Sequence, residues 1–544
     1  DYDGALADWP KDADTGAYTT DGGFLMEMDF YSIGDDTLAS CTTGYKQPLY
    51  FSAPEPGADA ETEAEQIAIV NSFKGTSLYQ YANTYTQTFE YALHSDDFFY
   101  RDSDKHYAAD AWQDWTGWHA NYNTVSYQDA VNTGKHYSQL FDMDSLINNF
   151  IFCEYAMNWD SMKNSFFYYK DVNELAKIGP QWDFDWAWGN INMYNINTWY
   201  PTSWHTTEDD FTREQYYQTV QWNRMLIRDP WFVMKAYEKY KEIRPTYIEE
   251  MIKTGGLLDS YYAQLKEAGA ANDAVWDYTY TTEYNGATSV GFEESYANMK
   301  NFIKTRVAWL DQQFASLDKL MTSLGYYKTS SDIKVASVSK GSKETTIKAT
   351  TTNSAVKTIV FQVNGTTQIE AAVVNGSAVA KVPNSVLEAS ATAMNMVQVL
   401  AKNSTGNYIY NASASQTGNY RVVKSNYQTF YNVNAGKISV SKTKLTLKQG
   451  TTSTITASVL PGNALNRNVT WKSSNTTVAT VVNGKITAKA PGTAKITATT
   501  NDGTALSASC TVTVKAAAPA LKFKTATNCV ELSWSKAVGG VKYE

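Results

Sequence analysis

Histidine and cysteine are scarce in this chain of 544 residues, and their spacing excludes several kinds of site. None of the five histidines shows HxxxH or HxH spacing, so a zinc centre is not expected. The four cysteines form no CxxC pair, which excludes a zinc ribbon and a disulfide-stabilised scaffold. A GxSxG motif is also absent, which argues against a nucleophilic hydrolase built on that turn.

Long hydrophobic runs are missing as well. No stretch of about 18 consecutive apolar residues occurs, so the sequence predicts no transmembrane helix. No signal peptide is visible, although the chain begins with Asp1 and not with Met. The chain also stops inside an expected strand, and we therefore interpret both ends as cuts.

The net charge of −10 hides a strong asymmetry along the chain. Residues 1–100 hold 18 acidic against 3 basic residues, whereas residues 424–544 hold 3 acidic against 15 basic residues. The lysines of the second region alternate with Thr, Ser and Val, which favours solvated strand faces over a nucleic-acid site. A face that binds a polyanion such as a cell-wall polymer is the alternative.

The length of the chain and the change in its composition along the sequence predict a multidomain protein. A chain of this length is too long for one core, and its hydrophobic fraction of 43% is ordinary for globular domains. Aromatic residues are frequent before residue 310, while Thr, Ser, Val, Ala and Lys dominate after about residue 327. We expect an α+β domain at 1–327, β-sandwiches at 331–423 and 437–515, and the start of a further β domain at 519–544.

The elements expected in the first domain place acidic residues together. Residues 22–30 alternate like a half-exposed strand, residues 60–100 have helical periodicity, and a short helix is expected at Tyr261–Leu265. A helix capped by Asp142 leads to Asp160. A strand at Phe166–Lys170, a turn and a second strand follow, so that Asp160 and Asp183 are expected at one end of a hairpin.

Three carboxylates, Asp160, Asp183 and Asp185, lie among aromatic residues in this stretch. Carboxylates in apolar surroundings need partners, and a metal ion is the simplest partner for several at once. The pair of Asp160 and Asp183 suits metal-assisted phosphoryl transfer, in which one Asp orients the nucleophile and the other holds Mg²⁺. The alternative is structural: these residues are helix caps and turn formers.

The segment from Phe141 to Gly189 resembles the CotH kinase family of spore coat proteins. The shared features are a helix followed by a catalytic-loop motif, a strand and a metal-binding motif, namely Asn158-Trp159-Asp160, Tyr168-Tyr169-Lys170-Asp171, and Gly179-Pro180-Gln181-Trp182-Asp183-Phe184-Asp185 with Gly189. The resemblance implies an atypical protein-kinase fold whose small lobe is incomplete here, and an enzyme that uses ATP with Mg²⁺ or Mn²⁺.

By the same resemblance, Asp160 is the catalytic residue and Asp183 a metal ligand. Asn164 is a candidate second ligand, although it follows Asp160 by four positions and not by the five of ordinary kinases. Asp185 is a further candidate ligand. No GxGxxG loop occurs, so we expect the nucleotide-binding basic residue to precede residue 1, with Lys46 as a weaker candidate.

The last third of the chain resembles modules of bacterial surface proteins. Residues 438–514 are similar to bacterial Ig-like domains of group 2, on the motifs Val469-Thr470-Trp471-Lys472-Ser473-Ser474-Asn475, Gly484-Lys485-Ile486-Thr487-Ala488 and Pro491-Gly492-Thr493-Ala494. Residues 519–544 resemble the first strands of a fibronectin type III module. Such modules imply export and carry no catalytic residues.

Together these features predict a secreted or cell-surface bacterial kinase that phosphorylates Ser or Thr on an extracellular protein. The alternative is a catalytically degenerate kinase-fold adhesin or scaffold. Its tryptophan-rich surface would bind a glycan or a partner protein, and the Ig-like modules would act as spacers.

Overall fold

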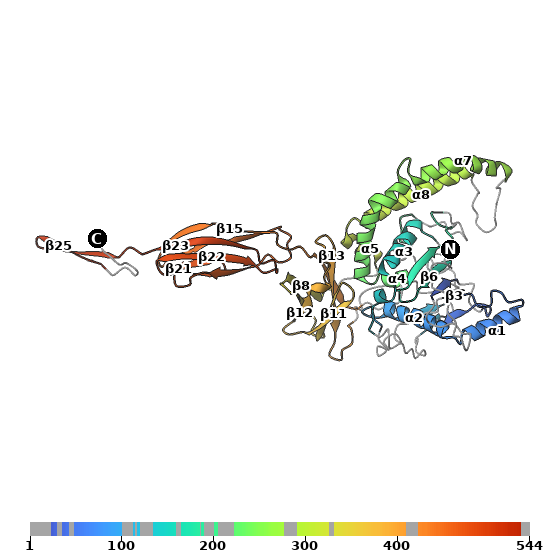
Figure 1. Cartoon of the computed structure of the whole chain (residues 1–544), viewed down its shortest axis with the longest axis horizontal. Helices are drawn as coiled ribbons and strands as arrows, with labels where there is room; N and C mark the ends of the chain where they lie inside the picture. The colour runs from blue at the N-terminus through green and yellow to red at the C-terminus, as the bar shows by residue number, and fades with distance from the viewer. Residues whose placement is uncertain are drawn as a thin grey trace. The chain divides into compact units, whose positions relative to one another are not determined.

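The computed structural model describes most of the chain (Figure 1). The described residues are 23–29, 35–42, 48–100, 112–114, 117–119, 134–158, 165–184, 186–189, 201–204, 222–276, 291–325, 331–409 and 423–534. They divide into two compact units: residues 1–330 with 408–424 form unit 1, and residues 331–407 with 425–544 form unit 2. Among the described residues, no helix is long and apolar enough to cross a bilayer.

Unit 1 contains a five-stranded antiparallel sheet in the order β2-β3-β1-β6-β7. Its strands are β1 (Phe24–Met28), β2 (Ser40–Thr42), β3 (Pro48–Ala53), β6 (Phe166–Lys170) and β7 (Lys177–Gln181). A separate short hairpin pairs β4 (Trp112–Asp114) with β5 (Gly117–His119). The strand predicted at Phe166–Lys170 is confirmed, and its partners β1 and β7 bring distant parts of the chain together.

Helices account for most of the other described residues of unit 1. They are α1 (Glu63–Phe73), α2 (Ser77–His94), α3 (Met143–Ala156), α4 (Trp222–Leu226), α5 (Pro230–Ile243), α6 (Glu249–Ile252), α7 (Leu257–Val275), α8 (Phe292–Gln313) and α9 (Leu317–Leu324), with the short helix η4 (Tyr137–Gln139) and the π-helix η6 (Arg244–Ile248). The helix expected at Tyr261–Leu265 exists but is longer than predicted, since α7 continues through the Ala-rich stretch 268–274. That stretch lacks apolar periodicity, but alanine favours a helix without it.

One face of the sheet forms an aromatic core. Phe24, Phe51 and Tyr168 are buried, and the Phe24 ring lies edge-on to Tyr168, with 6.2 Å between the centroids. Helix α2 covers this face, since the Thr86 and Tyr168 hydroxyls are hydrogen-bonded and Tyr81 contacts Phe24. Because side chains alternate along a strand, the opposite face carries the more exposed residues.

A buried polar cluster ties η4 to the start of α5. Asp229 caps α5 by accepting a hydrogen bond from the Trp231 amide, and its carboxylate also accepts the Tyr137 hydroxyl at 2.8 Å. His136 is fully buried, with its Nε2 3.8 Å from Asp229 Oδ2. Burial lowers the pKa of His136 to about 3, against the opposing charge of Asp97, and burial raises the pKa of Asp229 to about 6.

This cluster predicts a pH dependence of the stability of unit 1. Below the ordinary histidine pKa of 6.5 the unfolded state binds a proton that folded His136 does not bind, so acidification costs stability. The raised pKa of Asp229 opposes this loss between about pH 6 and 4. In His136→Asn, which retains an acceptor for the Ser138 amide, the histidine contribution disappears.

We therefore expect the free energy of unfolding of His136→Asn to fall less steeply than that of the native chain, by about 1 kcal/mol per pH unit between about pH 6 and 4. Urea denaturation at several pH values measures this difference. Parallel curves for the two proteins would contradict a neutral, buried His136.

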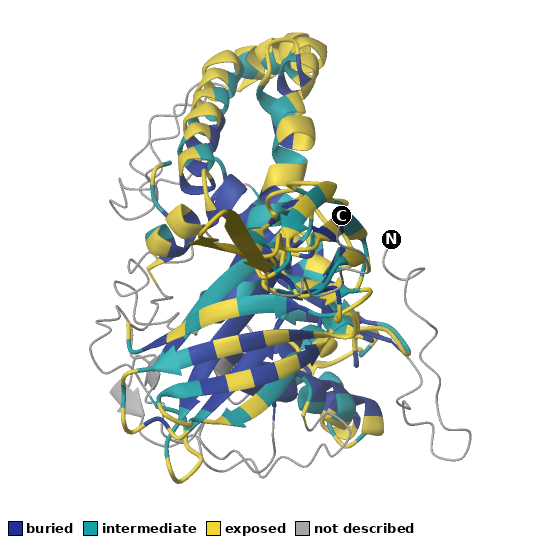
Figure 2. Cartoon of the chain, turned by 90° about the vertical axis from the view of Figure 1, so that its left-hand side faces the viewer, coloured by how far each residue is buried: buried dark blue, intermediate teal, exposed yellow. Residues whose placement is uncertain are grey.

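Unit 2 is built from antiparallel sheets with one parallel pair, β16 with β23. The strands before residue 432 are β8 (Ile333–Lys340), β9 (Glu344–Thr351), β10 (Thr358–Val363), β11 (Thr367–Ala372), β12 (Ser377–Pro383), β13 (Met394–Lys402) and β14 (Ser425–Tyr431). They form two sheets, β12-β9-β8 and β11-β10-β13-β14. Buried and exposed residues alternate along β9 and β12, and Figure 2 shows such alternation as dark blue and yellow bands along strands.

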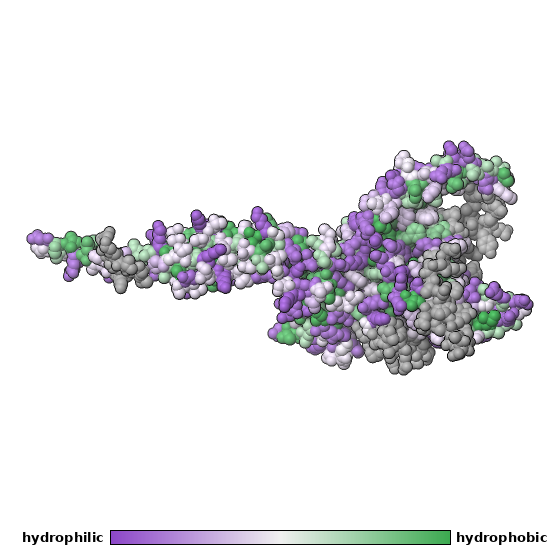
Figure 3. All heavy atoms as spheres, in the orientation of Figure 1, coloured by the Kyte–Doolittle hydropathy of each residue, from purple (hydrophilic) through white to green (hydrophobic). Residues whose placement is uncertain are grey.

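The later strands of unit 2 form a second sandwich and a terminal hairpin. These strands are β15 (Lys437–Val440), β16 (Lys444–Lys448), β17 (Thr452–Thr454), β18 (Ala457–Leu460), β19 (Val469–Ser473), β20 (Ala479–Val482), β21 (Lys485–Ala488), β22 (Gly492–Thr500), β23 (Ser507–Lys515), β24 (Leu521–Ala526) and β25 (Cys529–Trp534). The β24–β25 hairpin exposes apolar side chains, among them Phe523 at 73% and Leu532 at 53%. Figure 3 shows this green surface at the β25 end of the view.

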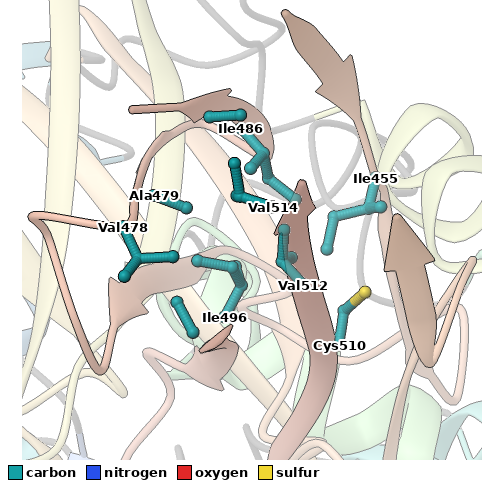
Figure 4. Close-up of a cluster of buried hydrophobic side chains, with 10 residues drawn as sticks. Ile455, Val478, Ala479, Ile486, Ile496, Cys510, Val512 and Val514 are labelled. Atoms are coloured by element: carbon teal, nitrogen blue, oxygen red, sulfur yellow. The ribbon is translucent and has the colours of Figure 1, made fainter. Parts of the chain in front are cut away.

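The second sandwich has a compact aliphatic core (Figure 4). Its members include Ile455, Ile486, Ile496 and Val512, all at most 1% exposed. Ile486→Ala is expected to lower the free energy of unfolding of unit 2 by about 2–5 kcal/mol, because it leaves a cavity in this core. Chemical denaturation measures the loss.

Val482→Ala is the matched control, since Val482 lies on the neighbouring strand and is 71% exposed. Its effect is expected to stay within about 0.5 kcal/mol. Equal effects of the two substitutions would show that the second sandwich does not depend on this core.

Candidate active site around Asp183

Asp183 is the second residue after β7 and has a left-handed backbone conformation, with φ of +57°. Few non-glycine residues adopt positive φ, and Asp is among those that tolerate it best. The preceding Trp182 is 61% exposed, an unusual position for a large aromatic side chain. Two consecutive residues just beyond β7, Trp182 and Asp183, are therefore both exposed to solvent.

Three segments converge on Asp183. The Asn158 side-chain amide, just beyond α3, donates to the Asp183 carbonyl oxygen at 3.2 Å. The Ser165 hydroxyl, just before β6, donates to Asp183 Oδ2 at 3.3 Å. Because both partners are fixed by the ends of regular elements, they restrict the backbone and the carboxylate of Asp183. The structure thus joins the end of α3, the start of β6 and the end of β7 at one point.

The other predicted site residues, Asp160, Asn164 and Asp185, lie outside the described residues. Their roles as catalytic residue and metal ligands stay predictions, as does the expected position of Asp160 and Asp183 at one end of the hairpin. Within the described ranges, no group of three or more His, Cys, Asp or Glu side chains could hold a metal ion. Asp183 itself suits Mg²⁺ or Mn²⁺, since it offers an exposed hard oxygen ligand that one neutral hydroxyl already orients.

A buried ion pair anchors the helix that leads to this site. Arg306 of α8 is fully buried and donates from Nη2 to Glu154 Oε2 at 2.9 Å and from Nε to the Glu154 carbonyl at 2.6 Å. Its Nη1 donates to the Ser203 carbonyl, and its guanidinium lies 4.7 Å from the Trp309 ring centroid. Glu154 lies in the last turn of α3, so Arg306 fixes the end of the helix from which Asn158 follows.

Sequence reasoning did not identify this pair, although a signal was present. Arg306 lies between Ile303, Val307 and Leu310, which are spaced as one apolar face of α8. A charged residue within such a face needs a buried partner. The sequence does not reveal which of many acidic residues provides it, because Glu154 is 152 positions away.

Two family models match separate parts of the chain. Residues 63–310 match the family model described as CotH kinase protein, and residues 435–512 match the model of the bacterial Ig-like domain (group 2). The first match contains Asp160, Asp183 and both residues of the Glu154–Arg306 pair. The predicted multidomain architecture is confirmed in its coarse form: a region of helices and sheet that matches the CotH kinase model is followed by Ig-like sandwiches.

Curated relatives match only short parts of their own length. An uncharacterized protein of Clostridium acetobutylicum is 52% identical over 81 residues, which are 15% of this chain and 8% of that protein. Lacto-N-biosidase of Bifidobacterium bifidum is 47% identical over 81 residues, 15% of this chain and 7% of that enzyme. The minor capsid protein of Enterobacteria phage T3 is 44% identical over 80 residues, 15% and 18% of the two chains.

Similar solved structures include fibronectin(III)-like modules of Clostridium thermocellum CbhA, with 16% identity, 34% of this chain and 94% of that chain covered, and a TM-score of 0.17. The N-terminal part of the bacterial S-layer protein SbsC matches with 13% identity, 57% and 68% coverage, and a TM-score of 0.21. These scores are too low to support an argument about this chain.

Proposed function

We propose that unit 1 is a protein kinase that transfers the γ-phosphoryl group of ATP to Ser or Thr of an extracellular or cell-surface protein. The observation that carries this proposal is the CotH kinase match over residues 63–310, which includes both Asp160 and Asp183. The exposed carboxylate of Asp183, held where α3, β6 and β7 meet, supports it. The bacterial Ig-like match supports an extracellular setting.

Phosphoryl transfer depends mainly on positioning and on neutralising charge. Bound Mg²⁺ or Mn²⁺ supplies positive charge beside the phosphate oxygens. In this proposal Asp183 would hold the metal ion, with Asn164 and Asp185 as further ligands. Ser165 and Asn158 fix the orientation of Asp183 through its carboxylate and its carbonyl oxygen. Asp160 would accept the proton of the substrate hydroxyl as the new phosphorus–oxygen bond forms, while the bond from the γ-phosphorus to the β–γ bridging oxygen breaks and ADP leaves.

Metal-dependent nucleotide binding tests this proposal first. Isothermal titration calorimetry of the full-length protein with ATP is expected to show saturable binding with Mg²⁺ or Mn²⁺ and none with EDTA. Absence of binding under both conditions would overturn the kinase proposal and favour a degenerate scaffold. Binding that EDTA leaves unchanged would contradict the role of Asp183.

A further inference from the structure

A buried polar cluster lies within unit 2, at the junction between the first sandwich (β8 to β14) and the second sandwich, which begins with β15. Only residues 432–436 separate the end of β14 from the start of β15. Lys340, the last residue of β8, is only 8% exposed, which is rare for lysine. Buried ammonium groups need hydrogen-bond partners, so the surroundings of Lys340 show what this cluster does.

Lys340 connects both sandwiches and the segment between them. Its Nζ donates to Asn432 Oδ1 and to Asn434 Oδ1, each at 2.6 Å, and both acceptors belong to the connecting segment. Its carbonyl oxygen accepts the side-chain amide of Asn466, which precedes β19 of the second sandwich. One residue of the first sandwich is therefore bonded to the connecting segment and to a loop of the second sandwich.

Asp502, in the β22–β23 loop, holds the same joint from the second sandwich. Its Oδ2 accepts the Ala435 amide at 2.6 Å, and it is only 3% exposed. Burial lowers the pKa of Lys340, whereas the negative charge of Asp502 raises it. The two buried groups of opposite charge thus both bond to the connecting segment.

The backbones also approach closely at this joint. Gly503 has φ of +94°, and a Cβ atom there would lie 2.8 Å from Ser342 Cα in the β8–β9 turn. The Leu465 amide donates to the Val433 carbonyl at 2.9 Å, which adds another bond between the connecting segment and the second sandwich. A side chain at 503 would separate the two loops.

We infer that the Lys340-centred cluster locks the two sandwiches of unit 2 into one rigid body. Neighbouring domains normally move relative to each other unless their interface is extensive. Here a short connecting segment has its side-chain and backbone groups bonded from both sides. Breaking the joint leaves buried polar groups unpaired, which opposes the opening of the hinge. This inference does not depend on the proposed kinase activity.

Distance measurements between spin labels test the rigid joint. In the full chain with Cys529→Ser, labels are attached at Val379→Cys and Val482→Cys, which lie on exposed sites of the first and second sandwich. Double electron–electron resonance is expected to give a narrow distance distribution in this background. Lys340→Met is expected to make the distribution about twofold broader, because hinge motion becomes free.

Lys348→Met, on an exposed site of β9, is the matched control and should leave the distribution narrow. If Lys340→Met does not fold, two other variants take its place: Asn434→Ala, which removes one acceptor of the Lys340 ammonium, and Asp502→Ala, which removes the acceptor of the Ala435 amide. A broad distribution in the background chain would overturn the inference. So would an unchanged narrow distribution in the folded joint variants.

Discussion

Replacing Arg306 by methionine is expected to lower the free energy of unfolding of unit 1 by about 3–5 kcal/mol. Arg306 and Glu154 are both buried, and their mutual attraction offsets the cost of taking two charges out of water. Methionine leaves the Glu154 carboxylate buried without this positive charge. It also leaves the carbonyls of Glu154 and Ser203 without their guanidinium donors. The larger part of the loss of unfolding free energy comes from these buried groups, which no longer have a partner.

Urea denaturation of the full chain, followed by tryptophan fluorescence, measures the effect. Lys304→Met, on an exposed position of the same helix, is the control and should stay within about 0.5 kcal/mol. The double variant Glu154→Gln/Arg306→Met should lose less than the sum of the single variants, because the pair is coupled. Additive losses would show that the two side chains act independently.

Asp183→Ala is expected to reduce metal-dependent phosphoryl transfer by about 10³-fold or more, since charge neutralisation is central to this chemistry. The substitution removes the carboxylate that would hold the metal ion. The backbone at +57° favours Asn over Ala, so Asp183→Asn separates the loss of charge from backbone strain. Both variants should lose transfer, while Asp183→Asn keeps the stability of the native chain within about 0.5 kcal/mol.

Glu174→Gln is the matched control for Asp183. Glu174 lies at the other end of the β6–β7 hairpin, where it forms an exposed ion pair with Lys177 at 2.6 Å. Its loss should leave transfer unchanged. Equal transfer by Asp183→Asn and the native chain would show that Asp183 does not hold the metal ion.

Local sequence features predicted the local structure well. Asp142 caps α3 as expected and accepts the Ser145 amide at 2.8 Å. Asn-Gly pairs are the local sequence signal for turns with positive φ, and both residues have positive φ at Asn364-Gly365 and at Asn375-Gly376. These features depend on residues near each other in the sequence.

Features that depend on distant residues were not predictable in the same way. The Glu154–Arg306 pair joins α3 to α8, and the Tyr137–Asp229 bond joins η4 to α5. Each of these residues has many possible partners in the sequence, and only the folded structure shows which one it contacts. For the candidate site, sequence reasoning identified Asp183 but not its hydrogen bonds to Asn158 and Ser165. The roles of Asp160, Asp183, Asn164 and Asp185 all remain predictions from the family resemblance.

Label transfer from ATP by the native chain tests the central claim most directly. The full chain is incubated with γ-labelled ATP, Mg²⁺ or Mn²⁺, and a mixture of bacterial surface proteins, beside Asp183→Ala. We predict metal-dependent label on Ser or Thr residues with the native chain and none with the variant. No transfer by the native chain, or equal transfer by the two proteins, would contradict a kinase centred on Asp183.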